Sequence, residues 1–276
     1  MGELTRPRRL WPVAATAGLA VLLAACTPTE PEPTESPSSP PAQVATSVFF
    51  TLDTRAGFRL ASELRDVDAA QPIHDAVETM IAGPQDPDYA TTWNPATQVL
   101  GVTEDSGNVE VDLSGDARTA NVGSELAALM IQQLVHTITA ATAADNTVEL
   151  LIDGEQAGEL WGAVVWDGPI GRADPLNTRL LVQIDEPRQG ATVTSPVTVT
   201  GEAAVFEGTV LWRVLDDEGT ETQSGFTNTS EGQALAPFSF DVDLGPGTHT
   251  IEVFEDDVSG GEAGAPMVDS KEVTVD

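Results

Sequence analysis

The sequence predicts an α+β domain followed by an all-β sandwich of the immunoglobulin type, behind an export signal and a stalk. Three observations lead to this prediction. An apolar run near the start ends at the single cysteine of the 276-residue chain, and a proline-rich segment follows it. Up to about residue 166, strand patterns are interrupted by two helical patterns. From about residue 180, only short strand patterns remain, separated by turn residues.

Residues 1–25 have the parts of an export signal. Arg6, Arg8 and Arg9 form a cationic front, and an apolar run with small residues at its end follows from Leu10 to Ala25. This run is short for a membrane-spanning helix and has the composition of a signal peptide. We therefore expect residues 1–25 to be removed on export.

Cys26 is the predicted lipid attachment site. It follows Leu23-Ala24-Ala25, and this order is similar to the bacterial lipobox, in which the cysteine receives a diacylglyceryl group and the signal is cut just before it. An exported protein with one cysteine cannot form an internal disulfide, so the thiol needs another purpose. Two or more acyl chains make a stable anchor, since each buried CH2 contributes about 0.8 kcal/mol. The alternatives are an ordinary signal with an incidental free cysteine, or an uncleaved N-terminal anchor.

Residues 26–45 predict a stalk between the anchor and the first domain. Six prolines and three glutamates lie between Thr27 and Gln43. Such a segment favours extended polyproline II and cannot bury a core. At ~3.1 Å per residue it reaches up to ~50 Å. We expect the protein to sit on the extracytoplasmic face of the cell membrane, held through Cys26.

The chain is strongly acidic. It has 44 acidic and 12 basic residues, for a net charge of −32. This field repels nucleic acid and anionic headgroups, so we expect neither as a partner. The expected partners are envelope proteins, with self-association kept open. An acidic bias of the whole source proteome would explain the same composition.

The first domain is predicted over residues 46–166. Strand patterns cover residues 46–53 and 57–67 around the turn TRAG, and a helix begins at Pro72 and stops at Gly83-Pro84. Two strands follow within residues 97–114, around the turn DSGN.

The strongest helical pattern spans residues 121–141, and a last strand covers residues 146–154. The apolar stripe of this helix consists of Val122, Leu126, Leu129, Met130, Leu134, Val135 and Ile138. The order ββαββαβ predicts an α+β domain with both helices on one face of the sheet.

The second domain is predicted over residues 180–276. Seven short strand patterns separated by turns are typical of an immunoglobulin-like sandwich, and Trp212 is the candidate for its buried tryptophan. The disulfide of antibody domains is excluded, because Cys26 is the single cysteine. Residues 167–179 are the predicted linker. Because each half has a complete local pattern, we expect the two domains to fold independently.

Both halves also resemble known families. The first half contains, in order, Ala82-Gly83-Pro84, Leu100-Gly101-Val102, Val109-Glu110-Val111-Asp112-Leu113-Ser114, Gln132-Gln133-Leu134-Val135-His136-Thr137-Ile138-Thr139 and Ile152-Asp153-Gly154. These motifs resemble the GerMN (sporulation and spore germination) domain. The second half contains Ser195-Pro196-Val197-Thr198-Val199-Thr200-Gly201, Phe206-Glu207-Gly208-Thr209-Val210, and Leu244-Gly245-Pro246-Gly247 before Ile251-Glu252-Val253. These resemble the immunoglobulin-like domain that accompanies GerMN in bacterial envelope proteins.

The resemblance implies an envelope or sporulation-linked lipoprotein. GerMN domains are similar to the ring-building modules of secretion and sporulation complexes, which implies an assembly role and a related α+β fold. Asn94-Pro95 departs from the family pattern, which more often has an aliphatic residue before the proline. The family supplies no catalytic residues to carry over and no cofactor.

The residues themselves also indicate a non-enzymatic protein. The three histidines, His74, His136 and His249, do not form an H-E-x-x-H motif, and the sequence has no G-x-S-x-G elbow and no phosphate-binding glycine loop. We interpret His136, beside the apolar stripe of the long helix, as a surface or core-edge histidine. No cofactor is expected.

One acidic loop is a weak candidate for calcium. In FEDDVSGGEAG, Asp256, Asp257 and Glu262 offer hard oxygen ligands beside glycines. The EF-hand spacing is missing, so the expected affinity is in the ~0.1–1 mM range of extracellular modules. Solvated turn charge is the alternative.

The leading hypothesis is therefore a lipid-anchored, non-enzymatic envelope protein that acts as a protein-interaction or assembly module, related to sporulation or germination. The alternative is a wall-associated module that binds a ligand, peptidoglycan or another glycan, which exposed aromatic residues on one sandwich face would favour. A third class, a cell-wall hydrolase or its activator, needs a cleft with a pair of catalytic carboxylates.

Overall fold

The computed structural model describes residues 42–256, 262 and 264–276. Pro41–Asp276 form one compact unit. The predicted signal peptide, Cys26 and the stalk up to residue 41 lie outside the described residues, as does Asp257 of the calcium candidates.

The unit begins with a long antiparallel hairpin. Its strands are β1 (Gln43–Thr54) and β2 (Gly57–Asp68), which pair along their whole length. The predicted turn is confirmed, and Gly57 closes it with a φ of 87°, which glycine adopts without steric cost. β1 begins at Gln43 rather than at residue 46, because its first three residues keep the register with β2. The predicted stalk therefore overlaps the strand by these three residues.

Both outer edges of the hairpin are hydrogen-bonded to other parts of the chain. On the β1 side, Phe49 N donates to Thr137 Oγ1 (3.1 Å), and Phe49 O accepts from Gln133 Nε2 (2.9 Å). Both partners belong to helix α2 (Ser124–Thr142). On the β2 side, Leu180 N donates to Leu60 O (2.8 Å). Unpaired edges would leave free backbone donors and acceptors, so these bonds fix the hairpin between α2 and the start of the second half.

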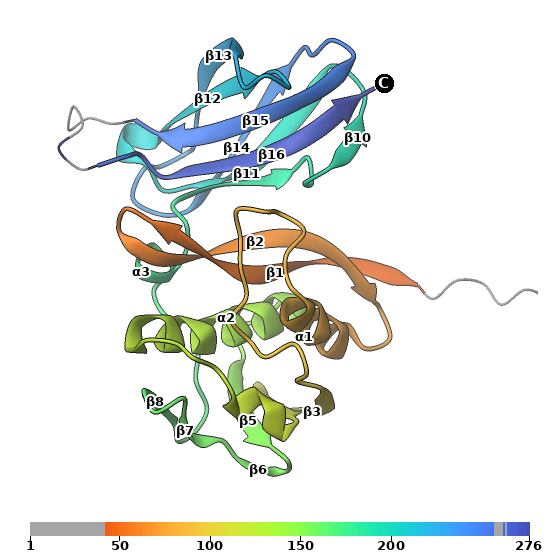
Figure 1. Ribbon diagram of the computed structural model, residues 1–276, viewed down its shortest axis with the longest axis vertical. Helices are drawn as coiled ribbons and strands as arrows, with labels where there is room; N and C mark the ends of the chain where they lie inside the picture. The colour runs from red at the N-terminus through yellow and green to blue at the C-terminus, as the bar shows by residue number, and fades with distance from the viewer. Residues whose placement is uncertain (1–41, 257–261, 263) are drawn as a thin grey trace, which may run out of the picture. The chain divides into compact units, whose positions relative to one another are not determined.

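Two helices lie between this hairpin and a second sheet (Figure 1). They are α2 and α1 (Pro72–Ala82), which begins with its proline in the first turn, as predicted, and ends at Gly83. The sheet has the order β3-β4-β5-β6, with strands β3 (Val99–Asp105), β4 (Asn108–Leu113), β5 (Thr147–Ile152) and β6 (Glu155–Gln156). Both helices cover one face of this sheet, as predicted.

The hairpin does not join that sheet, although the sequence predicts one sheet. Its two strands pair only with each other and form a sheet of their own. The neighbouring residues Phe49 and Phe50 point to opposite faces and are both buried. A strand with one solvated face would alternate instead. The hairpin is therefore a separate layer, covered on both sides.

Short elements complete the first half and lead to the second. They are the 3-10 turn η1 (Gly115–Arg118), strands β7 (Gly158–Leu160) and β8 (Val164–Trp166), and helix α3 (Pro175–Thr178). The predicted linker, residues 167–179, runs along the first half, where Ile170 N donates to Val148 O and Val148 N donates to Ile170 O (2.8 Å each).

The second half is the predicted sandwich. One sheet has the order β10-β16-β15-β12-β13 and the other the order β14-β11-β9. Their strands are β9 (Val182–Glu186), β10 (Ala191–Val193), β11 (Val197–Ala203), β12 (Thr209–Leu215), β13 (Glu221–Asn228), β14 (Ala236–Val242), β15 (Gly247–Glu255) and β16 (Val268–Val275), with the 3-10 turn η2 (Phe206–Gly208) before β12. The sequence patterns miss β10, a three-residue edge strand that pairs parallel to β16. Trp212 is half-buried and stacks on Phe240 of the other sheet, with ring centroids 4.9 Å apart.

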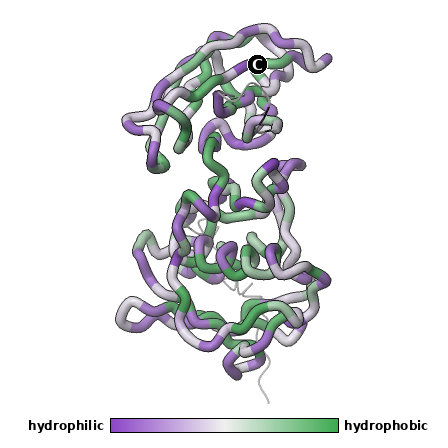
Figure 2. Tube along the Cα trace, turned by 90° about the vertical axis from the view of Figure 1, so that its left-hand side faces the viewer, coloured by the Kyte–Doolittle hydropathy of each residue, from purple (hydrophilic) through white to green (hydrophobic). Residues whose placement is uncertain are grey.

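The core is continuous through both halves. One cluster of buried apolar side chains extends from Val111 of β4 and Leu134 of α2 to Leu180, Val199 and Val253 of the sandwich. Figure 2 shows hydrophobic stretches of chain in both halves. Among the described residues, no helix combines the length and the apolar character needed to cross a membrane.

Candidate functional site

The most unusual chemistry lies where the two halves meet. Lys271, the single lysine of the chain, is 3% exposed on β16. Its Nζ donates to Asp86 Oδ2 (2.7 Å), Tyr89 OH (2.8 Å) and Asp269 Oδ1 (2.9 Å). Asp86 and Tyr89 belong to the loop between α1 and β3, so an ammonium group from the sandwich is bound by the first half.

Strand alternation puts these polar groups inside. Along β16 every second residue is buried, which places Asp269 and Lys271 on the same face as Val273 and Val275. The loop residue Tyr89 packs its ring against the ammonium group, 4.6 Å from Nζ to the ring centroid. The strand therefore brings an ion pair into a position that is normally apolar.

The hydrogen bonds of this cluster are saturated. Asp269 Oδ1 accepts from Tyr89 OH (2.5 Å) and from Lys271 Nζ and Ser270 N, while Oδ2 accepts from Ile184 N (2.7 Å). Burial lowers the pKa of Lys271, but Asp269 and Asp86 outweigh burial and raise it, so the ammonium stays charged. Burial and the nearby carboxylates raise the pKa of Tyr89 well above its usual value, so it remains a hydrogen-bond donor.

Further bonds surround the cluster. Gln183 of β9 is fully buried and exchanges two hydrogen bonds with Ser62 of β2, from Ser62 N to Oε1 (2.9 Å) and from Nε2 to Ser62 Oγ (2.6 Å). At the rim, Arg188 forms a bidentate ion pair with Asp66. The halves therefore share a buried polar junction and a continuous core, and their independent folding stays a prediction.

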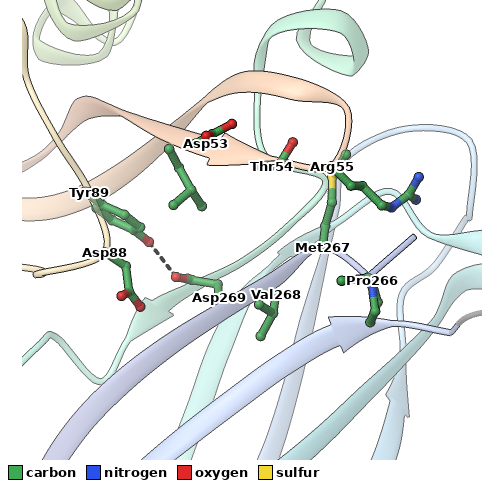
Figure 3. A pocket seen from close by; sticks show the side chains of 11 residues that line it. Asp53, Thr54, Arg55, Asp88, Tyr89, Pro266, Met267, Val268 and Asp269 are labelled. Atoms are coloured by element: carbon green, nitrogen blue, oxygen red, sulfur yellow. Dashed lines mark hydrogen bonds between the residues drawn. The ribbon is translucent and has the colours of Figure 1, made fainter. Parts of the chain in front are cut away.

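A groove of about 460 Å³ opens beside this junction. Figure 3 shows Tyr89 on one side and Met267 on the other, with Arg55 and Pro266 beyond. Arg55 is bound to Glu255 (Nη2 to Oε1, 2.6 Å). Because both oxygens of Asp269 are occupied, this carboxylate is a structural acceptor in the groove wall and not a free base.

His136, predicted at the surface or the edge of the core, lies inside the core. It is 2% exposed in α2, its ring lies 5.0 Å from that of Phe49, and neither ring nitrogen has a hydrogen-bond partner. Burial first, and then Arg172 and Arg179, lower its pKa to about 3. A histidine that stays neutral at physiological pH cannot shuttle protons there.

The structure also brings together one histidine and two carboxylates that the sequence patterns do not single out as a site. His74, Asp75 and Glu78 on α1 hold potential ligand atoms within 4.8 Å of one another. Asp75 Oδ2 already accepts from Asp68 N (2.8 Å), which gives it a structural role at the helix start. Of the calcium candidates, Asp256 and Glu262 are exposed, so calcium binding there stays a prediction.

Comparisons with known proteins agree with the two halves. One family model, described as sporulation and spore germination, matches residues 47–158, and another, described as the immunoglobulin-like domain of bacterial spore germination, matches residues 181–262. Among curated proteins no significant match to the sequence is found. The resemblance predicted from the motifs is confirmed.

Solved structures show likeness at low identity. A protein described as a lipoprotein from Clostridium perfringens is 19% identical over 50% of this chain and 93% of its own, with a TM-score of 0.35. The first GerMN domain of the sporulation protein GerM from Bacillus subtilis is 17% identical over 48% of this chain and 99% of its own, with a TM-score of 0.36. The tandem GerMN domains of that protein are 15% identical over 73% of this chain and 62% of their own, with a TM-score of 0.36.

Proposed function

We propose that this chain, which carries a domain of the sporulation and spore germination family and the immunoglobulin-like domain of bacterial spore germination, is a lipid-anchored, non-enzymatic envelope protein. It assembles with other proteins. The observation that carries the proposal is the order of parts. A lipobox-like Leu23-Ala24-Ala25-Cys26 and a proline-rich segment precede the two matched domains.

The chemistry of the described residues supports a binding role. The buried groups that resemble a catalytic constellation, Lys271, Asp269 and Tyr89, bond to one another and to backbone, and they join the halves. A junction of this kind stabilises a fixed shape, which a scaffold needs. Hydrolysis of wall material by residues 42–276, abolished by a single carboxylate substitution, would contradict the proposal.

The glycan-binding alternative rests on exposed aromatic residues. Among the described residues, Phe206 and Phe226 are the phenylalanines whose rings are largely exposed to solvent. Phe206 lies in η2 and Phe226 on a sheet face of the sandwich. The same face carries the half-buried ring of Phe254, over which Arg213 lies. One exposed ring beside a partly covered one is a weak platform for sugar stacking, so protein assembly remains the preferred function.

The anchor is tested by Cys26→Ala. We expect the wild-type protein to begin at Cys26, to carry a diacylglyceryl group and to fractionate with membranes, because two or more acyl chains bind a bilayer stably. The variant should accumulate as unlipidated precursor or as protein cleaved elsewhere. Intact-mass spectrometry of both fractions measures the difference.

Ser36→Ala, in the same proline-rich segment, is the matched control and should be processed like the wild type. A wild-type protein cut at another site, with an unmodified Cys26, would remove the lipid anchor from the proposal.

A further inference from the structure

An apolar stripe crosses the outer face of the five-stranded sheet. The pairing register aligns Phe226 of β13 with Leu211 of β12, Leu211 with Phe254 of β15, and Phe254 with Val268 of β16. These residues alternate with fully buried neighbours such as Val210 and Val253, so they lie on the solvent side. Phe226 is 68% and Val268 40% exposed. At about 4.8 Å between strands, the stripe is about 14 Å long.

The two ends of the stripe have different shapes. At the β13 end, Phe226 is the most exposed large apolar side chain among the described residues. At the β16 end, a hollow of about 240 Å³ is lined by Phe254, Val268, Ala265, Pro266, Arg213 and Glu252. One face therefore carries both a projecting ring and an apolar hollow.

An ion pair runs beside the stripe. The next row of the sheet aligns Ser224, Arg213, Glu252 and Ser270. Arg213 Nε donates to Glu252 Oε2 (2.5 Å), and its guanidinium lies 5.4 Å from the ring centroid of Phe254. Arg213 belongs to β12 and Glu252 to β15, the two strands at the middle of the stripe.

We infer that this face binds a second copy of the chain, with a two-fold axis parallel to the strands and between β12 and β15. Such a rotation exchanges β12 with β15 and β13 with β16. Phe226 of each copy then meets the hollow beside Val268 of the other, Leu211 meets Phe254, and Arg213 meets Glu252. Two aligned sheets pack face to face in this way, about 10 Å apart.

The pattern favours a second copy over another occupant because it is self-complementary. A two-fold interface needs each feature and its complement on the same patch, and here the ring and the hollow, and the cation and the anion, lie on opposite sides of one axis. Charge agrees with this choice. In a chain of net charge −32, most surfaces would repel a second copy, whereas this stripe and the row beside it carry one cation for one anion.

The start of the described chain fits the same axis. In Figure 1 the strands of the five-stranded sheet run roughly from side to side, and β1 begins at the right-hand side. A rotation about an axis along the strands leaves both β1 starts on the same side. Two copies anchored through their N-terminal segments, as the proposed function requires, could therefore pair on one membrane.

The stripe is small for an interface. Four partly exposed side chains offer on the order of 300 Å² per copy, against about 800 Å² per partner in a standard stable complex. We therefore expect residues 42–276 to be monomeric in solution at micromolar concentration. Confinement on a membrane raises the effective concentration toward the millimolar range, at which so small a surface suffices.

The test uses residues 42–276, which lie within the compact unit, held on vesicles by an N-terminal histidine tag and a nickel-chelating lipid. A donor or acceptor dye on a cysteine in the tag reports association by energy transfer. The artificial tether separates the two proposals, because a failure here leaves the lipidation of Cys26 untouched. We expect energy transfer between donor and acceptor dyes to exceed the level for non-interacting monomers distributed at random at the same surface density.

Two sets of variants decide the outcome. Phe226→Ser should weaken association at least about tenfold, as the loss of an aromatic anchor does, whereas Phe206→Ser, at the other exposed phenylalanine, should not. Arg213→Glu and Glu252→Arg should each abolish association between copies of the same variant, because the side chains at positions 213 and 252 of the two copies then carry like charges. A mixture of the two should restore it, and this gain cannot result from misfolding.

Transfer at the random level for the wild type, or no restoration in the mixture, would overturn the inference. Phe226-dependent sedimentation with purified peptidoglycan, without association of copies, would also overturn it and assign the stripe to a glycan.

Discussion

Asp185 of β9 has a carboxyl group whose surroundings oppose its charge. Burial first, and then the carboxylate of Glu202, raise its pKa to about 6, with Asp269 adding to the rise. A hydrogen bond from Gln183 and the charge of Arg179 act in the opposite direction. Because the pKa is higher in the folded than in the unfolded protein, this group favours folding below about pH 4 and loses that contribution as the pH rises through 6.

Asp185→Asn should therefore stabilise the protein at neutral pH. One pKa unit corresponds to about 1.4 kcal/mol, so we expect the free energy of unfolding to rise by about 1 to 2 kcal/mol near pH 7.5. The gain should fall close to zero at about pH 3, below the ordinary pKa of the carboxyl, where the wild-type group is largely protonated in both states. Urea unfolding of residues 42–276 at the two pH values measures it.

Asp217→Asn, at an exposed turn position after β12, is the control and should change stability little at either pH. Equal stabilisation by Asp185→Asn at both pH values would show that the charge of Asp185 is not the cause.

At the scale of elements, two strand glycines look alike in the sequence and differ in the structure. Gly101 and Gly201 each lie at a register shift, in β3 and β11. A side chain at Gly201 would overlap with the backbone oxygen of Gln183 and meet the ring of Phe238 at 2.6 Å, whereas one at Gly101 would have nothing within 4 Å. Close backbone approach therefore requires glycine at one position only.

Gly201→Ala should lower the free energy of unfolding by about 2 to 3 kcal/mol, since overpacking against a backbone atom cannot be relieved by a side-chain rotation. Gly101→Ala is the matched control and should raise it by at most about 1 kcal/mol, because alanine loses less backbone entropy on folding. Thermal and urea unfolding check both. Similar effects of the two substitutions would contradict the packing argument.

The elements with strong local signals could be predicted from the sequence. Pro72 and Gly83 bound α1, TRAG closes the first hairpin, and alternating runs give seven of the sandwich strands. β10 and the short β7 and β8 could not, because three residues are too few for a period to appear. The separate layer of the hairpin was also beyond reach, since it depends on which elements pack against its two faces.

At the scale of the whole molecule, the junction was the part least open to prediction. Lys271 stands in KEVTVD, where alternation places it on the same face as Val273 and Val275, but the sequence does not show which groups would neutralise a lysine there. Its partner Asp86 is 185 residues away in sequence, and no local pattern links the two. The outer stripe has the same origin, because its four residues come from four strands and meet only through the register.

The junction should make the two halves unfold together. In Lys271→Met, Asp86 and Asp269 would remain buried without their cation, and removing one partner of a buried ion pair costs about 3 to 5 kcal/mol. Calorimetry of residues 42–276 should show one cooperative transition for the wild type. For Lys271→Met we expect a lower melting temperature, or two transitions as the halves separate.

Arg188→Met is the matched control for that prediction, because the Arg188–Asp66 ion pair crosses the same junction at its exposed rim. Exposed pairs contribute only about 0 to 1 kcal/mol, so this variant should keep the single transition close to its wild-type temperature. The contrast separates a buried charge from a surface charge between the same two halves. Two transitions in the wild type would show that the halves unfold independently. Equal losses in both variants would mean that the continuous apolar core, and not the lysine, couples them.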